Sequence, residues 1–266
     1  MNRIEKKVLN LKQNKEKAFV AYITAGHPTP EHFKDIILSL EEVGVDIVEV
    51  GVPFSDPVGD GPVIQSASLT ALNNGTTPTK VLQWISEVRK YSNIPILLFS
   101  YFNPILAHKP ANFLELSANS GVDGILCVDL PVEEAEEYVA KAREVNISTV
   151  FLIAPTSSEE RIAKIVKYSS GFVYYISRLG VTGEKQDLAQ DLEQRVSLIK
   201  KYTTLPVYVG FGISKPEQAK IVASIADGVI VGSALVRFLE EHKNDSDWKK
   251  KFEDYTRSLV EGVKNI

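Results

Sequence analysis

Glu49 interrupts a short apolar run, Ile47-Val48-Glu49-Val50, whose composition is typical of a strand buried on both faces. A carboxyl group in such a place loses hydration, and this loss raises its pKa towards neutral pH. A pKa near neutrality is what a general acid or base requires. An ion pair with a lysine or arginine is the structural alternative. We favour a role for Glu49 in proton transfer, because it lies near the carboxyl end of its predicted strand.

Two more carboxylates follow at once in the loop Gly51–Pro62, which carries Asp56 and Asp60. Its three prolines and three glycines combine stiff and permissive backbone. Loops of this length are often binding loops or lids. Local Asx turns, which aspartates commonly form, explain the same composition equally well.

Glycines recur at two places where an anion could be bound. The segment Gly210-Phe211-Gly212-Ile213-Ser214 follows one apolar run, and Gly232-Ser233 follows the next and opens a helical pattern. Glycines let backbone N–H groups approach an anion, and a helix N-terminus favours negative charge. The pair therefore predicts a phosphate site, with tight turns as the alternative.

A fourth candidate is Ser177-Arg178-Leu179-Gly180-Val181-Thr182-Gly183, followed by the polar run Glu184–Asp187. Its composition favours a flap that pivots on glycines and excludes water when it closes. An ordinary surface loop is the alternative.

The elements that must position these residues alternate between short apolar runs and longer amphipathic ones. Alternation in units of about 25–35 residues predicts a parallel sheet, and eight units predict a closed (β/α)₈ TIM barrel. An open doubly wound sheet is the rival, but no G-x-G-x-x-G motif follows the first run. We expect one domain over residues 1–266. The predicted strands are Phe19–Thr24, Asp46–Gly51, Pro95–Ser100, Gly124–Asp129, Thr149–Ile153, Phe172–Ser177, Pro206–Gly210 and Asp227–Val231.

Helical spacing fills the intervals and adds helices beyond the eight units. In Met1–Gln13, the stripe Ile4, Val8 and Leu11 predicts a helix that plugs the lower end of the barrel. Extra helices are also expected in the loop region before the third strand and in the tail. The predicted helices are Pro30–Val43, about 63–72, one from Pro78, Pro131–Val145, Ser157–Lys167, Leu188–Lys201, Lys215–Ile225, Ser233–Glu241 and about 247–263.

Composition excludes several classes of protein. The net charge is −4 over 266 residues, which argues against nucleic-acid binding. Cys127 is the single cysteine, so no intramolecular disulfide can form and a reducing, cytoplasmic setting is expected. The four histidines show no metal-binding spacing. No apolar run approaches the ~20 residues of a membrane span, and Met1–Lys17 lacks the core of a signal peptide.

In combination and in order, these motifs closely resemble the α subunit of tryptophan synthase. The resemblance rests on Glu49, on F-S-D-P-x-x-D-G-P within Pro53–Pro62, on G-V-T-G at the flap and on G-F-G-I-S. It covers essentially the whole chain. It implies a (β/α)₈ barrel that cleaves indole-3-glycerol phosphate to indole and glyceraldehyde 3-phosphate. It also implies that Glu49 and Asp60 are the catalytic pair and that the phosphate is bound by Gly183, Phe211, Gly212, Gly232 and Ser233.

These implied roles agree with the chemistry of a retro-aldol cleavage. Indole becomes a leaving group when its carbon 3 is protonated, and a carboxylate near the ring nitrogen, Asp60, stabilises the resulting charge. Glu49 would protonate carbon 3 and remove the glycerol hydroxyl proton. Neither a metal nor a Schiff-base lysine is required. The resemblance also implies that Thr182 orients the aspartate, and we expect pocket walls at Phe19, Tyr22, Phe99, Tyr101, Ile153 and Tyr174.

Three positions depart from the family pattern. The family often has T-x-G-D-P where this chain has Thr24-Ala25-Gly26-His27-Pro28, and proline is common where Ala21 stands. Gly59 replaces the usual alanine before Asp60, which predicts a more mobile loop. None of these changes removes a catalytic group, and we expect His27 to be a surface residue without consequence.

The resemblance also implies a partner, a pyridoxal-phosphate-dependent β subunit in an αββα tetramer that receives the indole. Pyridoxal phosphate would belong to that partner, and no cofactor is expected in this chain. Two alternatives remain open: a stand-alone indole-glycerol-phosphate lyase, and a phosphate-binding barrel that has lost catalysis. The residues that match the partner-contact positions are Pro53, Asp56, Pro57, Asn103, Asp129 and Pro131.

Overall fold

A ring of parallel strands forms the centre of the protein in the computed structural model, which describes residues 1–177, 185–210 and 212–266, with backbone alone at 185–188. The strand order is β5-β4-β3-β2-β1-β9-β8-β7-β6, and β5 and β6 are separated by Phe151 alone. The two ends of the sheet therefore meet, and the predicted barrel is confirmed. The strands are β1 (Ala18–Thr24), β2 (Ile47–Gly51), β3 (Ile96–Ser100), β4 (Gly124–Cys127), β5 (Ser148–Val150), β6 (Leu152–Ile153), β7 (Val173–Ile176), β8 (Val207–Gly210) and β9 (Gly228–Val231).

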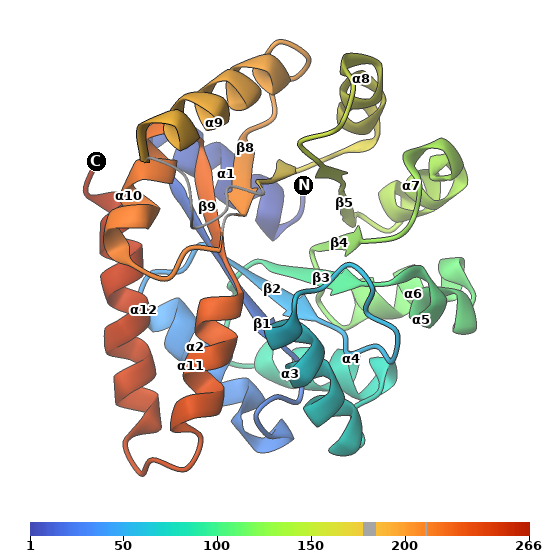
Figure 1. The fold of residues 1–266 in the computed structure, drawn as a ribbon. Helices are drawn as coiled ribbons and strands as arrows, with labels where there is room; N and C mark the ends of the chain where they lie inside the picture. The colour runs from blue at the N-terminus through green and yellow to red at the C-terminus, as the bar shows by residue number, and fades with distance from the viewer. Residues whose placement is uncertain (178–184, 211) are drawn as a thin grey trace.

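Helices surround this ring, and α11 and α12 lie side by side near the C-terminus (Figure 1). Each helix predicted from spacing has a counterpart, whereas α5 and α6 were not predicted, because Pro104 and Pro110 interrupt their pattern. The helices are α1 (Arg3–Asn14), η1 (Pro30–His32), α2 (Phe33–Glu42), α3 (Pro62–Asn73), α4 (Pro78–Val88), α5 (Phe102–Ala107), α6 (Pro110–Asn119), η2 (Val132–Glu134), α7 (Glu136–Glu144), α8 (Glu159–Tyr168), α9 (Lys185–Lys200), α10 (Pro216–Ile225), α11 (Ser233–His242) and α12 (Trp248–Lys264).

Alternate side chains of each strand enter two different cores. On β1, Ala18 and Val20 belong to the cluster inside the barrel, while Phe19 and Ala21 belong to the cluster between strands and helices. Both faces of β1 therefore pack against apolar side chains, and this is why the sequences of such strands are continuous apolar runs. The alternation decides which side chains can reach a site inside the barrel.

Helix α1 closes the lower end of the barrel, as predicted. Ile4, Val8 and Leu11 pack in the same cluster as the inward-facing Leu126 and Tyr208. A Cβ atom on Gly124 would lie 2.8 Å from the Ile4 Cδ1, so the missing side chain at Gly124 makes room for the plug. The lower half of the barrel is therefore filled, and a substrate can enter only from the opposite end.

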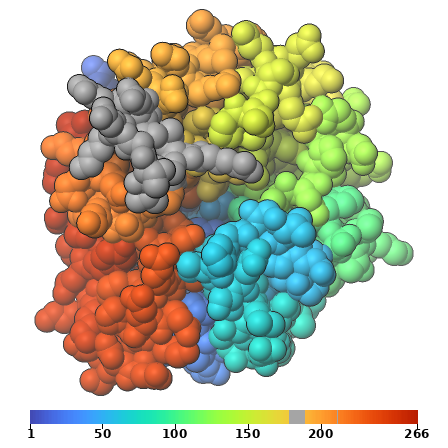
Figure 2. Space-filling model, viewed as in Figure 1, coloured from blue at the N-terminus to red at the C-terminus, as the bar shows by residue number. Residues whose placement is uncertain are grey.

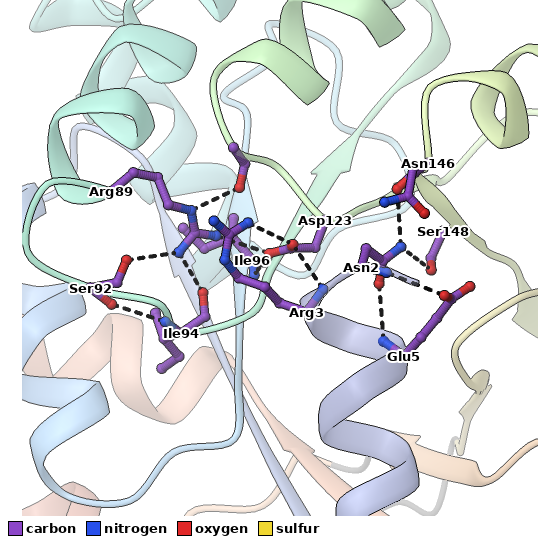
Figure 3. Close-up of polar contacts among 11 residues, drawn as sticks. Asn2, Arg3, Glu5, Arg89, Ser92, Ile94, Ile96, Asp123, Asn146 and Ser148 are labelled. Atoms are coloured by element: carbon purple, nitrogen blue, oxygen red, sulfur yellow. Dashed lines mark hydrogen bonds and ion pairs between the residues drawn. The ribbon is translucent and has the colours of Figure 1, made fainter.

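A buried carboxylate fastens the first turn of α1 to the barrel (Figure 3). Asp123 accepts hydrogen bonds from the Arg3 backbone N–H at 3.2 Å, the Arg3 Nη1 at 3.1 Å and the Arg89 Nη2 at 2.9 Å. It also accepts one from the Ile96 N–H at 2.9 Å. Asn2 caps the same helix and donates to the Ser148 Oγ at 2.8 Å. These contacts fix the plug against β3, β4 and β5.

Within the described residues, no helix has both the length and the apolar character that crossing a membrane requires.

Candidate active site

A cavity of about 260 Å³ opens at the carboxyl ends of the strands, where barrels carry their functional residues. On this face a hollow lies between the light-blue segment that precedes α3 and the orange-red α11 (Figure 2). A larger hollow of about 1120 Å³ beside α9 is lined by neither Glu49 nor Asp60. The smaller cavity is lined by Tyr22, Glu49, Gly59, Asp60, Gly61, Ile64, Phe99, Val128, Leu152, Tyr174, Ile176, Ser177, Gly210, Gly212, Ile230, Gly232 and Ser233.

Glu49 enters this cavity because strand alternation turns it inward, one layer above Ile47. Its neighbours across the sheet are Tyr22 on β1 and Leu97 on β3. The side chain is buried, and neither carboxyl oxygen has a hydrogen-bond partner among the described residues. Burial, followed by the negative charge of Asp60, raises the pKa of Glu49 to about 8. The group therefore carries a proton at neutral pH.

Asp60 reaches the same cavity from the loop that follows β2. Its backbone N–H donates to the Pro57 carbonyl at 3.0 Å, which closes a turn just before α3. Burial raises the pKa of Asp60 to about 6, and a hydrogen bond from the Tyr101 hydroxyl acts in the opposite direction. At pH 7 the Asp60 carboxyl is therefore ionised while Glu49 is protonated. Two carboxyl groups with separated pKa values are the usual arrangement for divided acid and base roles.

Aromatic rings border the two carboxyl groups. Tyr22 and Phe99 meet edge to face with ring centroids 5.4 Å apart. A Cβ atom on Gly51 would lie 2.2 Å from the Tyr22 hydroxyl oxygen, so this ring lies against the next strand only because residue 51 is glycine. Burial raises the pKa of Tyr22 and keeps its hydroxyl protonated. Aromatic side chains thus form part of the cavity wall beside the two carboxyl groups, as is common in small-molecule sites.

The six predicted pocket walls divide into three groups. Tyr101 is not among the residues that line the cavity; its hydroxyl instead contacts the Gly59 N–H. Tyr22, Phe99 and Tyr174 line the cavity. Phe19 and Ile153 do not, because their side chains face outward and pack in the core beneath the helices. The expectation for these two residues was therefore wrong. Inward-facing residues that sequence reasoning missed, among them Val128, Leu152 and Ile230, line the cavity instead. Period-two counting along each strand from an inward residue such as Glu49 would have found them.

The predicted phosphate residues lie at the side of the cavity where β8 and β9 end. Gly212, Gly232 and Ser233 line it, and Ser233 is the first residue of α11. The first N–H groups of a helix have no partner within the helix, and they attract anions. Gly212 has a φ of +55°, and no described atom lies within 4 Å of the position that a Cβ would take. Gly183, Phe211 and Thr182 lie outside the described residues.

The residues expected to contact a partner follow three adjacent strands, β2, β3 and β4. Asp56, Asn103, Asp129 and Pro131 are exposed, Pro57 is half-buried and Pro53 is buried. The Asp129 Oδ1 accepts a hydrogen bond from the Phe102 N–H at 2.6 Å, which ties the loops after β3 and β4 together. Since these strands are neighbours in the sheet, their loops share one side of the cavity entrance.

His27 differs most from its expectation. It is buried, and its Nε2 lies 3.0 Å from the Glu240 Oε2 on α11. The expectation of an exposed residue was therefore wrong, because it could not take into account a helix more than two hundred residues further along the chain.

As to metals, the described part of the chain holds no group of three or more histidine, cysteine or acidic side chains that could bind an ion.

The sequence and the fold of this chain are similar to those of known proteins. The model of the family described as tryptophan synthase alpha chain matches residues 8–264. Tryptophan synthase alpha chains of Geotalea daltonii and Geotalea uraniireducens are 49% identical over 241 residues and 45% identical over 266 residues. These alignments cover 91% of both chains in the first case, and 100% of this chain and 99% of the relative in the second. The crystal structure of tryptophan synthase subunit alpha from Legionella pneumophila superposes with a TM-score of 0.92 at 36% identity, over 100% of both chains.

Proposed function

The chain belongs to the tryptophan synthase alpha chain family, and from this premise we propose that it cleaves indole-3-glycerol phosphate between Glu49 and Asp60. The products are indole and glyceraldehyde 3-phosphate, and the enzyme is a carbon–carbon lyase of tryptophan biosynthesis. One observation supports the assignment most strongly: Glu49 is buried without a hydrogen-bond partner among the described residues, in the cavity that Asp60 also lines. A group so costly to bury has a use that structural packing does not explain.

In the proposed reaction the protonated Glu49 transfers its proton to carbon 3 of the indole ring. The ring nitrogen then carries positive charge, which the ionised Asp60 stabilises. The glycerol hydroxyl next to carbon 3 returns a proton to Glu49 and becomes the aldehyde carbonyl. The bond between carbon 3 and the glycerol carbon breaks, and its electron pair restores the aromatic ring. The proton count balances, and Glu49 is ready for another turnover.

Binding of the phosphate at Gly212, Gly232 and Ser233 would orient the substrate for these steps. The α11 N-terminus and the carboxyl groups line one cavity, so a short glycerol tail can span from one to the other. The apolar walls at Phe99, Val128 and Leu152 would hold the indole ring and exclude water. Gly183, Phe211 and Thr182 remain assigned to this site by resemblance alone.

We also propose a β subunit as partner, in an αββα tetramer that passes indole directly to it. The exposed Asp56, Asn103, Asp129 and Pro131 support a docking surface beside the cavity entrance. Pyridoxal phosphate would belong to the partner, because the cleavage described here needs proton transfers alone. A cytoplasmic setting agrees with a chain whose single cysteine permits no intramolecular disulfide.

The test is release of indole from indole-3-glycerol phosphate by the purified chain, with and without added β subunit. Glu49→Gln should lower the rate by at least about 100-fold, the usual contribution of a general acid–base group. The matched control is Glu41→Gln on the outer helix α2, which should retain the wild-type rate. Detectable release of indole would exclude a non-catalytic scaffold. A rate that is the same with and without the β subunit would identify a stand-alone lyase. No release under either condition would contradict the proposal.

A further inference from the structure

The segment Ala25–Thr29, which follows β1, holds a buried histidine that the reaction does not use. The His27 Nε2 lies 3.0 Å from the Glu240 Oε2 in the last turns of α11. The other ring nitrogen, Nδ1, is buried and has no partner among the described residues. Burial lowers the pKa of His27, although Glu240 raises it. A neutral ring whose Nε2–H donates to the Glu240 carboxylate accounts for both observations.

The same segment is fastened on its other side to the end of α3. The Asn74 Nδ2 donates hydrogen bonds to the carbonyls of Gly26 at 3.2 Å and Pro28 at 3.1 Å. Gly26 has a φ of +83°, and a Cβ there would lie 2.1 Å from the Thr76 Oγ1. The chain at Gly26 thus passes directly against the residues that follow α3. Ala25–Thr29 therefore joins the far end of α3 to the far end of α11.

The near ends of these two helices are the ones that face the cavity. Helix α3 starts at Pro62, next to the cavity-lining Asp60 and Gly61, and α11 starts at Ser233 beside Gly232. The two helices also pack against each other. Because a helix moves as a rigid rod, a contact at its far end helps to fix the direction of its near end. The hydrogen bonds of His27 and Asn74 therefore help to fix the positions of both Asp60 and the anion site at the start of α11.

We propose that His27 is a positioning residue: through Glu240 it sets the N-terminus of α11 at the distance from Asp60 that a phosphorylated substrate requires. This inference rests on the proposed function, and it assigns a role to a residue that neither touches the cavity nor takes part in proton transfer. Glu240 is well placed for the contact, since Lys243 binds its second oxygen at 2.6 Å and leaves Oε2 to the imidazole. A hydrogen bond to a charged carboxylate is stronger and more directional than a neutral one.

Five variants, one of them the double variant His27→Leu/Glu240→Ala, test the proposal in the full chain with its β subunit. His27→Leu and Glu240→Ala each remove the contact, whereas His27→Gln keeps an N–H donor at a similar reach. His32→Leu is the control, because His32 packs against Trp248 with tilted rings and contacts Thr29 of the same segment, but it has no hydrogen bond to Glu240 among the described residues. We measure kcat and KM for indole-3-glycerol phosphate, and we measure the affinity for indole-propanol phosphate by calorimetry.

We expect His27→Leu and Glu240→Ala to raise KM and weaken analogue binding by about fivefold or more, a modest coupling between distant sites, while kcat changes little. The double variant should resemble either single variant, and His27→Gln should resemble wild type. A purely structural role would lower the active fraction, and with it kcat, at unchanged KM; that result would overturn the proposal. If the wild type releases no indole, the proposed function fails. The affinities of the wild type and the His27 variants for indole-propanol phosphate would still show whether His27 acts on the anion site.

Discussion

The Tyr101 hydroxyl oxygen accepts a hydrogen bond from the backbone N–H of Gly59 at 3.0 Å. This bond joins the end of β3 to the residue immediately before Asp60. The same hydroxyl donates to the Asp60 carboxyl and opposes the rise in its pKa that burial causes. Tyr101 was expected to be a wall around the indole ring, whereas its contacts are those of a residue that holds the loop carrying Asp60.

Tyr101→Phe should therefore weaken catalysis without removing any group that touches the reacting atoms. Without the hydroxyl, the pKa of Asp60 rises above about 6 and the loop loses an anchor. We expect kcat/KM at pH 7 to fall by about tenfold, as for the loss of about one hydrogen bond to a charged group. The acidic limb of the pH profile should move to higher pH. Tyr91→Phe, at an exposed position, is the control, and an unmoved acidic limb would contradict this role.

The pH dependence of cleavage should be bell-shaped. Asp60 must be ionised and Glu49 must be protonated, so kcat/KM rises as pH passes about 6 and falls as pH passes about 8. Because the two groups interact, these values belong to the pair. Asp60→Asn should remove the acidic limb from the residual activity and move the basic limb to lower pH, because the negative charge that helps to raise the pKa of Glu49 is lost. A profile that stays flat between pH 5 and pH 9 would separate catalysis from both carboxyl groups.

The barrel could be predicted from sequence because strands buried on both faces leave eight apolar runs, and because Ile4, Val8 and Leu11 form a visible helical stripe. The same feature hides which side chains face inward. Phe19 and Val20 look equally apolar, yet only Val20 lies in the inner cluster. Ile153 was misplaced for the same reason: nothing in its apolar run marks Leu152, rather than Ile153, as the side chain that faces the cavity.

Glu49 was recognisable from sequence because a carboxyl group is conspicuous among apolar neighbours. His27 was not, because its burial depends on a helix that begins at Ser233, and no local pattern encodes that contact. Helices α5 and α6 were missed because prolines at positions 104 and 110 read as loop signals, although Pro110 stands at a helix start where proline is well tolerated. Local signals thus predicted the candidate carboxyl groups, and tertiary packing determined the contacts around them.

Glu49 should cost the protein stability at alkaline pH. Its pKa is about 8 in the folded protein and near 4.5 in the unfolded chain, so the folded state binds more protons between these values. The free energy of unfolding therefore falls as pH rises from about 4.5 to about 8, by on the order of a few kcal/mol. Glu49→Gln cannot ionise and escapes this loss. Its melting temperature should match that of the wild type at pH 4.5 and exceed it by at least about 2 °C at pH 8.5.

A single charge introduced at Gly212 should test the phosphate site. The open space around residue 212 means that a substitution meets no described atom, although its φ of +55° favours glycine or asparagine. Gly212→Asp would place a negative charge beside the substrate phosphate, and Gly212→Asn is its neutral, equally sized control. We expect the aspartate variant to bind indole-propanol phosphate at least about tenfold more weakly than the asparagine variant, a like-charge effect of more than about 1 kcal/mol. Equal affinities would place the phosphate elsewhere.

The buried network beneath the barrel should affect stability and leave the chemistry unchanged. The side chains of Asp123 and Arg89 are 2% and 10% exposed, so removing the carboxylate by Asp123→Ala leaves the Arg89 charge buried and unpaired. We expect a loss of about 3–5 kcal/mol in the free energy of unfolding, measured by urea denaturation. Arg3→Ala removes a pair whose arginine is 39% exposed, and it should cost about 1 kcal/mol or less. Since the plug and the cavity occupy opposite ends of the barrel, the folded fraction of either variant should keep the wild-type kcat. A large drop in kcat for folded Asp123→Ala would instead reveal coupling between the two ends.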